Sequence, residues 1–197
     1  LNYLLNPQRM STTSKPYIEI DPQRSVLLLD RDGVINQRII NDYVKSWDEF
    51  VFMPGVLDAL SLLSKRYYGI AIVTNQQGVS KGLMSKEDLQ NIHHAMVEKI
   101  QSAGGQIHSI YAAIELASDH PLYRKPGVGW KATIERDFPE VDFSLSTMLG
   151  DSDSDIAFGK ALGCTTVGFG ENLTKNTADF HVNSWKSLLS KYAIDVH

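Results

Sequence analysis

Three short apolar runs, each followed at once by polar residues, constrain the fold of this chain more than any other feature. They cover residues 26–29, 70–73 and 148–150. A continuous apolar run of this length is typical of a central parallel strand that is covered on both faces. In open α/β sheets, ligands bind beyond the carboxyl ends of such strands. We therefore expect the three polar stretches to meet at one edge of a sheet.

Carboxylates dominate two of these strand ends. Residues 30–33 read DRDG, and residues 151–155 read DSDSD. Asp and Gly are ordinary turn residues, and Asp151 or Ser152 can cap a helix that ends at Gly163. Capping uses one oxygen, however, and three neighbouring carboxylates repel one another unless a cation compensates. The acidic clusters therefore favour a site for magnesium or calcium, which prefer oxygen ligands.

The remaining strand end is rich in hydrogen-bond donors. Residues 74–78 read TNQQG, and this combination of a hydroxyl group, amides and a glycine suits an oxyanion such as phosphate. Farther along, Arg124 and Lys125 precede Pro126 and Gly127. A basic pair of this kind is most often a solvated loop. Here two acidic strand ends and an anion pocket require a cationic partner, which favours a role in the site.

The order of elements predicts an α/β fold, a Rossmann-like three-layer α/β/α sandwich with a mainly parallel central sheet. Helices are expected from residue 56, from Ser85 to the glycines at 104 and 105, over 128–137 and over 184–192. A strand is expected over 107–114. Residues 36–53 form an irregular excursion, and no insertion is long enough for a separate cap domain.

Four motifs together resemble those of the haloacid dehalogenase superfamily, in the expected order and over residues 26–169. They are DRDGVIN at 30–36, VTNQ at 73–76, RKP at 124–126, and Gly150-Asp151 with Asp155. DRDGVIN, the Tyr43-Val44 pair, TNQQGVSKG and RKP resemble its capless branch. That resemblance implies magnesium-dependent hydrolysis of a small phosphomonoester, such as the 7-phosphate of D-glycero-D-manno-heptose 1,7-bisphosphate.

The resemblance also implies roles for individual residues. Asp30 would attack phosphorus and form an aspartyl-phosphate, and Asp32 would serve as general acid and base. Magnesium would be held by Asp30, the backbone carbonyl of Asp32 and Asp151. Lys125 would neutralise charge on the phosphate and on Asp30, and Asp155 would hold Lys125 or a metal-bound water in place.

Substrate contacts follow from the same motifs. Thr74 and Asn75 would donate to the phosphoryl oxygens. Gln76, Lys81 and Arg124 are the further candidates for substrate binding, and Lys81 and Arg124 would hold a second anion.

One departure from that branch concerns its usual zinc loop, which has a Cys-x-His pair and a Cys-x-Cys pair. The corresponding residues, 113–115 and 121–123, read AIE and PLY, and the only cysteine is Cys164. No structural zinc is therefore expected. Four alternatives are weighed: a histidinol-phosphate phosphatase, a polynucleotide 3′-phosphatase, a non-catalytic protein that binds a phosphorylated ligand, and a phosphomutase, which the missing cap disfavours because a cap would keep water out.

Composition sets broader bounds. A length of 197 residues fits one domain, predicted over 21–197 behind a flexible N-terminal tail over 1–20. The net charge of -4 disfavours nucleic acid as a partner, and no apolar stretch approaches the roughly 20 residues that span a membrane. A single cysteine fits a reducing, cytoplasmic compartment. We expect a monomer or small homo-oligomer that acts on a small phosphorylated metabolite.

Overall fold

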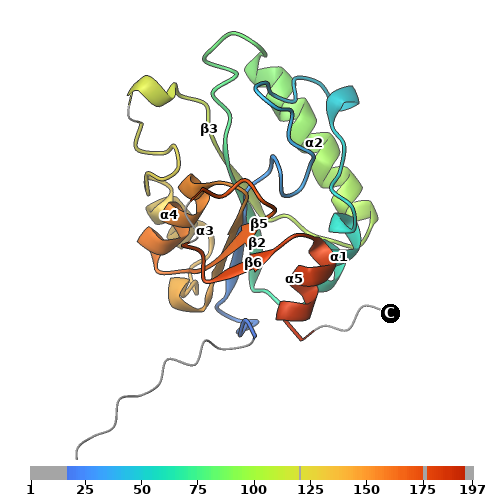
Figure 1. Cartoon of the computed structure of the whole chain (residues 1–197), viewed down its shortest axis with the longest axis vertical. Helices are drawn as coiled ribbons and strands as arrows, with labels where there is room; N and C mark the ends of the chain where they lie inside the picture. The colour runs from blue at the N-terminus through green and yellow to red at the C-terminus, as the bar shows by residue number, and fades with distance from the viewer. Residues whose placement is uncertain (1–16, 120, 175–176, 194–197) are drawn as a thin grey trace, which may run out of the picture.

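A six-stranded, all-parallel sheet forms the centre of the protein (Figure 1). The computed structural model describes residues 17–119, 121–174 and 177–193. The strands lie in the order β3-β2-β1-β4-β5-β6. Their bounds are Val26–Leu29 (β1), Gly69–Asn75 (β2), Ser109–Ala113 (β3), Thr147–Gly150 (β4), Thr165–Phe169 (β5) and Phe180–Val182 (β6). The predicted α/β class with a mainly parallel sheet is confirmed.

Helices cover both faces of the sheet (Figure 1). One apolar cluster joins one face to α1, α2 and α5, and a second joins the other face to α3 and α4. The helix bounds are Val56–Leu63 (α1), Lys86–Ser102 (α2), Lys131–Asp137 (α3), Asp153–Leu162 (α4) and Trp185–Lys191 (α5). The predicted three-layer sandwich is therefore what the chain forms.

Strand β1 shows why its sequence is apolar throughout. Leu27 and Leu29 belong to the cluster with α1, α2 and α5, whereas Val26 and Leu28 belong to the cluster with α3 and α4. All four side chains are fully buried. Successive side chains of a strand point to opposite faces, so only a strand covered on both sides requires this pattern.

The position of β1 also fixes where a ligand can bind. β1 pairs with β2 on one side and with β4 on the other. The chain therefore moves outward through β2 and β3, returns, and continues outward through β4, β5 and β6. The carboxyl ends of β1 and β4 face such a reversal of strand order, which is the usual binding crevice of open α/β sheets.

The helix ends follow local chemistry. Ser85 and Asp88 form a reciprocal capping box at the start of α2, and Ser152 and Asp155 form another at the start of α4. Gly163 ends α4 with a φ of 87°, as predicted for a helix C-cap. The helix expected from residue 128 begins instead at Lys131, because glycine at 129 disfavours the helical conformation.

Two further features differ from expectation. The short strand β6 was not predicted, because three residues are too few to display a periodic pattern. The residues of the predicted tail before Tyr17 lie outside the described part of the chain. Ile18, however, is 7% exposed, and its backbone N–H donates to the carbonyl oxygen of Lys191 at 2.8 Å. Ile18 therefore packs with the domain rather than in the tail.

The excursion between β1 and α1 is short and tied to the domain. An aromatic cluster of Trp47, Phe50 and Phe52 anchors it, with Trp47 and Phe50 stacked at 5.0 Å between ring centroids. Val44 is fully buried. Within the described residues, no helix combines the length and apolar character needed to cross a bilayer.

Candidate active site

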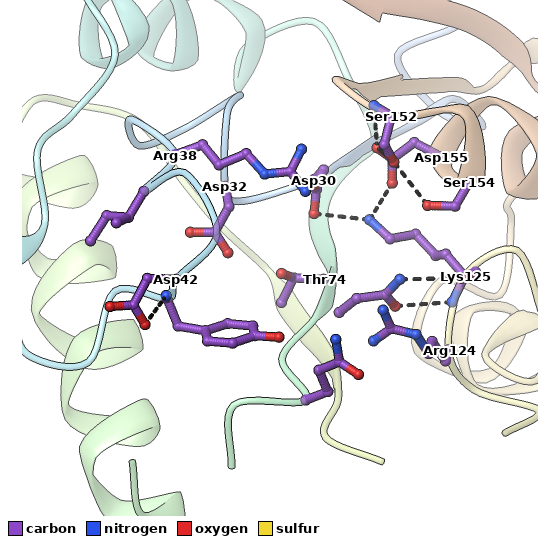
Figure 2. Close-up of a pocket in the computed structure, with 14 residues that line it drawn as sticks. Asp30, Asp32, Arg38, Asp42, Thr74, Arg124, Lys125, Ser152, Ser154 and Asp155 are labelled. Atoms are coloured by element: carbon purple, nitrogen blue, oxygen red, sulfur yellow. Dashed lines mark hydrogen bonds and ion pairs between the residues drawn. The ribbon is translucent and has the colours of Figure 1, made fainter. Parts of the chain in front are cut away.

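A polar cavity of about 150 Å³ lies at the carboxyl ends of β1, β2 and β4 (Figure 2). Six residues predicted to act in catalysis or substrate binding line this cavity, and so does Asp155, which was predicted to support them. The full lining is Asp30, Asp32, Arg38, Ile39, Asp42, Tyr43, Thr74, Asn75, Gln77, Arg124, Lys125, Ser152, Ser154 and Asp155. The predicted meeting of the three strand ends is therefore observed.

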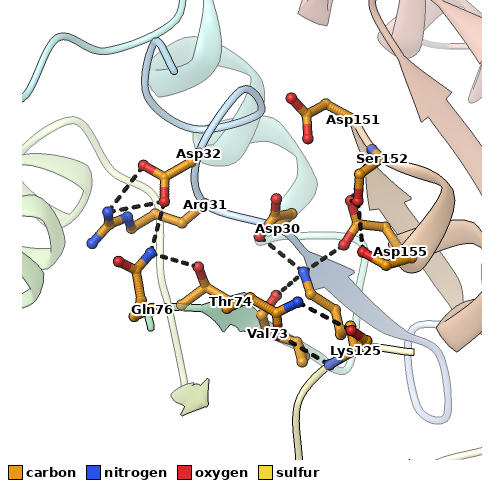
Figure 3. A network of polar contacts seen from close by, with 12 residues as sticks. Asp30, Arg31, Asp32, Val73, Thr74, Gln76, Lys125, Asp151, Ser152 and Asp155 are labelled. Carbon is orange, nitrogen blue, oxygen red and sulfur yellow. Dashed lines mark hydrogen bonds and ion pairs between the residues drawn. The ribbon is translucent and has the colours of Figure 1, made fainter. Parts of the chain in front are cut away.

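Lys125 forms the electrostatic centre of this cavity. Its Nζ lies 2.9 Å from Oδ1 of Asp30 and 2.5 Å from Oδ1 of Asp155, and it donates to the carbonyl oxygen of Val73 at 2.5 Å (Figure 3). Burial alone would lower the pKa of Lys125, but the charges of Asp155 and Asp30 raise it. The side chain is therefore a buried ammonium group.

Asp30 follows β1 directly and is held rigidly. Its backbone N–H donates to the carbonyl oxygen of Leu149 at 2.9 Å, which continues the pairing of β1 with β4. Burial raises the pKa of Asp30 to about 7, and the ion pair with Lys125 offsets only part of that effect. The charges of Asp155 and Asp151 raise it further. The site thus holds more negative charge than Lys125 balances.

The crowded carboxylates are spaced as ligands of one metal ion. Oxygen atoms of Asp30, Asp151 and Asp155 all lie within 4.8 Å of one another. Oδ1 of Asp151 is buried and has no hydrogen-bond partner among the described residues. Burial raises the pKa of Asp151. An oxygen-only set with an unsatisfied buried ligand atom fits a hard divalent cation such as magnesium.

Two glycines allow the strand-end loops to approach this closely. Gly33 has a φ of 87°, and a Cβ atom there would lie 2.1 Å from Oδ2 of Asp151. A Cβ atom at Gly150 would lie 2.1 Å from the Cβ of Asp155. Any other residue at either position would displace a carboxylate of the cluster.

Asp32 is turned away from the other carboxylates and is held by three donors (Figure 3). Nη2 of Arg31 donates to both of its oxygens, at 2.9 and 3.0 Å. Asn36 donates to Oδ1 at 2.9 Å, and Gln76 donates to Oδ2 at 2.7 Å. Burial would raise the pKa of Asp32, but the charge of Arg31 and these hydrogen bonds lower it.

Gln76 takes a different place from the one predicted. Its amide donates to Oδ2 of Asp32 at 2.7 Å and to Oγ1 of Thr74 at 2.8 Å, and its side chain is fully buried. It is not among the described residues that line the cavity. Gln76 therefore lies behind Asp32 and Thr74, which corrects its predicted role as a substrate contact. Because Gln76 donates to Thr74, the hydroxyl hydrogen of Thr74 is directed elsewhere.

Asn75 lines the cavity and also fixes the loop that carries Lys125. Its Oδ1 accepts from the backbone N–H of Lys125 at 3.0 Å, and its Nδ2 donates to the backbone carbonyl of Lys125 at 3.2 Å. The two contacts join the end of β2 to the RKP motif. Asn75 therefore positions Lys125, and its role at the phosphoryl group stays a prediction.

The two candidates for a second anion lie on different walls. Arg124 lines the cavity, and its Nη1 is buried without a hydrogen-bond partner in the described structure. Lys81 lies in an adjoining hollow lined also by Arg38 and Tyr43, where its Nζ donates to the hydroxyl oxygen of Tyr43 at 3.2 Å. Of the two, Arg124 therefore shares a cavity with Asp30 and Lys125, and Lys81 lines the adjoining hollow.

Sequence reasoning missed Arg38 and the network role of Arg31. Arg38 lines the cavity, and its Nη1 lies 3.1 Å from Oδ2 of Asp151. It comes from the irregular excursion, where no spacing marks an arginine as part of a site. The sequence offered one clue to the role of Arg31. It directly follows a residue at the end of a buried strand, and a charged side chain that is buried there requires a partner.

The segment that lacks the zinc-loop cysteines is organised by aromatic rings. Trp130 lies 4.7 Å from Tyr123 and 5.4 Å from Tyr111, measured between ring centroids. The backbone N–H of Gly129 donates to the carbonyl oxygen of Leu122 at 3.0 Å. Apolar contacts thus connect this loop to β3 and to the start of α3.

This fold, with its strand-end carboxylates and buried lysine, defines the class of haloacid dehalogenase-type phosphatases, as the sequence motifs predicted. The chain belongs to the family described as polynucleotide kinase 3 phosphatase, whose model matches residues 26–184.

Proteins with similar sequences include heptose bisphosphate phosphatases. The D-glycero-alpha-D-manno-heptose-1,7-bisphosphate 7-phosphatase of Mycobacterium bovis is 36% identical over 80% of this chain and 86% of its own length. The D-glycero-beta-D-manno-heptose-1,7-bisphosphate 7-phosphatase of Rhodopseudomonas palustris is 33% identical over 72% and 81%. Both anomeric activities thus occur among similar proteins.

A solved structure is similar over nearly its whole length. It is the D,D-heptose 1,7-bisphosphate phosphatase from B. bronchiseptica, complexed with magnesium and phosphate. The TM-score is 0.77 at 26% sequence identity, and the match covers 86% of this chain and 98% of that one.

Proposed function

We propose that this protein is a magnesium-dependent phosphatase that removes the 7-phosphate of a heptose 1,7-bisphosphate through an aspartyl-phosphate on Asp30. The observation that carries the proposal is the contact of buried Lys125 with Asp30 at 2.9 Å, in a cavity whose walls also present Asp32 and Thr74. The activities named for the relatives support the choice of a sugar bisphosphate.

The reaction divides into two displacements at phosphorus. In the first, a carboxylate oxygen of Asp30 forms a bond to phosphorus while the bond to the sugar oxygen breaks, and that oxygen takes a proton from Asp32. In the second, a water oxygen attacks phosphorus, Asp32 takes the proton of that water, and the bond between phosphorus and Asp30 breaks. Inorganic phosphate leaves, and both aspartates return to their starting forms.

The hydrogen bonds at Asp32 bear on this dual role. Three donors stabilise the carboxylate form, which is the form that takes a proton from water. The first displacement needs the protonated form. A bound phosphoryl group places negative charge near Asp32, and such a neighbour raises the pKa of a carboxyl group. Substrate binding therefore favours the proton that the leaving oxygen requires.

Positive charge and hydrogen-bond donors converge on the place of the phosphoryl group. Lys125 offsets charge on Asp30 and on the phosphoryl oxygens, and the hydroxyl of Thr74 is free to donate to them. Asp30 and Asp151 would hold magnesium, with Asp155 beside them bound to Lys125. When bound, the ion supplies electrostatic stabilisation that a carboxylate facing a phosphate otherwise lacks.

A substrate panel tests this proposal. The purified protein is assayed with the α and β anomers of D-glycero-D-manno-heptose 1,7-bisphosphate, histidinol phosphate and an oligonucleotide with a 3′-phosphate, each with magnesium or with EDTA. We expect turnover of a heptose bisphosphate to be the fastest and to require magnesium. The oligonucleotide is included because the family description names a polynucleotide phosphatase. Preferential turnover of the oligonucleotide or of histidinol phosphate would overturn the substrate assignment.

A further inference from the structure

His93 is a half-buried histidine that the mechanism above does not use. It lies in α2, and its Nε2 is 3.2 Å from Nη1 of Arg31, which follows β1. The two residues are 62 positions apart in the chain. His93 therefore reaches the reacting groups only through Arg31.

The chemistry of Arg31 fixes the form of His93. A guanidinium group only donates hydrogen bonds, so Nε2 of His93 must accept and the ring proton must lie on Nδ1. Burial and the nearby charge of Arg31 lower the pKa of His93 to about 3. The imidazole is thus a neutral acceptor, suited to a buried guanidinium.

Arg31 itself is fully buried and spans two acceptors. Nη2 donates to both oxygens of Asp32, and Nη1 contacts His93. Nε has no hydrogen-bond partner in the part of the chain that the structure describes. A buried guanidinium that lost His93 would leave a second nitrogen unsatisfied, which favours rotation toward another acceptor.

We propose that His93 is a positioning residue for the proton-transfer step: it holds Arg31 so that Arg31 aims Asp32 at the leaving oxygen. This inference rests on the proposed function, since it assigns to Asp32 the proton that the sugar oxygen takes. Asn36 and Gln76 still bind Asp32 without His93, so the carboxylate would be displaced rather than released.

The nature of the leaving group separates this role from a structural one. A sugar oxygen leaves poorly without a proton, whereas p-nitrophenolate leaves readily without one. The second displacement, in which Asp32 takes the proton of water, is common to both substrates, whereas kcat/KM reports the first displacement, in which the leaving oxygen departs. Loss of the aim of Asp32 should therefore lower kcat/KM for a sugar phosphate and spare kcat/KM for p-nitrophenyl phosphate. A general loss of packing around α2 would slow both substrates alike.

The experiment compares three variants on both substrates with saturating magnesium. His93→Leu removes the acceptor. His93→Gln keeps an acceptor oxygen at a similar distance from the backbone. His94→Leu is the matched control, because His94 is the adjacent residue of α2, is 77% exposed and contacts Glu98.

We expect His93→Leu to lower kcat/KM for the sugar phosphate about tenfold, a fraction of the hundredfold or more that general acid–base catalysis supplies. For p-nitrophenyl phosphate the change in kcat/KM should stay within about threefold, and His93→Gln should restore most of the kcat/KM lost on the sugar phosphate. His94→Leu should match the wild-type protein on both substrates. Equal losses on the two substrates, or no recovery with glutamine, would overturn the inference.

A second measurement does not depend on turnover. A crystal structure of His93→Leu should show the Arg31 guanidinium rotated and the Asp32 carboxylate displaced, and His93→Met serves if the leucine variant does not fold. Unchanged positions of both side chains overturn the inference whatever the rates are. Absence of phosphatase activity in the wild-type protein would instead overturn the proposed function. The crystal structure of the variant would then still show whether His93 holds Arg31 and Asp32 in place.

Discussion

Nη1 of Arg38 lies 3.1 Å from Oδ2 of Asp151, so a carboxylate of the candidate metal cluster already contacts a cationic side chain. The Asp151 side chain is 2% exposed and the Arg38 side chain 51% exposed. An ion pair with one solvated partner contributes only about 0–1 kcal/mol. A divalent cation at Asp151 therefore competes with Arg38 for the same charge.

Replacing Arg38 should strengthen magnesium binding. Arg38→Gln removes the competing cation, and we expect the dissociation constant for magnesium, measured by calorimetry without substrate, to fall about two- to fivefold, in line with the small energy of such a pair. Arg136→Gln is the control, because Arg136 pairs with Asp137 on α3, away from the cavity. Weaker magnesium binding in the Arg38 variant would show that Arg38 supports the metal site.

Replacing Asp30 should abolish turnover and keep the fold. Asp30→Asn substitutes a poor nucleophile for the attacking carboxylate, and we expect less than about a hundredth of the wild-type kcat. Because burial already raises the pKa of Asp30 to about 7, a neutral side chain is tolerated there, and the circular dichroism spectrum should not change. A variant that retains more activity would exclude the covalent mechanism.

Replacing Lys125 should reduce stability as well as activity. Lys125→Met leaves two buried carboxylates, Asp30 and Asp155, without their shared cation. Removal of one partner from a buried ion pair typically costs about 3–5 kcal/mol in free energy of unfolding, measurable by urea titration without magnesium. The double variant with Asp155→Asn should recover part of the loss. Losses that simply add would show that the two side chains are not coupled.

Replacing Arg124 should affect a bisphosphate more than a simple aryl phosphate. Arg124 lines the cavity that would receive the substrate, and its buried Nη1 has no hydrogen-bond partner among the described residues. Loss of a charge-assisted contact costs about 1.5–3 kcal/mol, so Arg124→Ala should lower kcat/KM for heptose bisphosphate about ten- to a hundredfold. The value for p-nitrophenyl phosphate should change little. An equal loss on both substrates would place Arg124 at the reacting phosphoryl group instead.

The buried state of His93 predicts a pH dependence of stability. Its pKa is lowered from 6.5 to about 3 in the native protein, so between these values the unfolded chain binds a proton that the native protein does not. The free energy of unfolding should therefore fall as the pH falls from about 6.5 toward 3. The variant His93→Gln should show a shallower decline over that range, measured by urea titration. An unchanged slope would contradict the assignment of His93 as a neutral acceptor.

Much of the site could be predicted because the sheet brings its parts together. Asp30, Thr74 and Asp151 each follow an apolar run, and parallel strands place such residues at one edge whatever the intervening sequence is. Local chemistry also predicted a helix capped by Asp151 or Ser152 and ended by Gly163, and α4 has Ser152 as its N-cap and Gly163 as its C-cap.

The unpredicted parts depend on contacts that have no local pattern. Gln76 occupies a motif position next to Asn75, and only the structure shows that its amide turns inward to Asp32. Arg38 reaches Asp151 across 113 positions from an irregular segment. His93 lies on a helix whose periodicity already explains its burial. The predicted cytoplasmic location and oligomeric state stay predictions.

The reacting residues lie at strand ends, whereas part of the cavity wall comes from the excursion over residues 36–53, and this difference bears on how the protein can evolve. Asp30, Thr74 and Asp151 lie at the ends of three interior strands, where a shift would disturb both apolar layers. Ile39 and Tyr43, by contrast, line the cavity from an excursion outside the sheet. Under the proposed function, we expect mutations at these two positions to alter which alcohol is released and to leave the strand-end carboxylates in place. We therefore expect substrate preference to diverge readily among descendants of this protein, and the type of reaction to be retained.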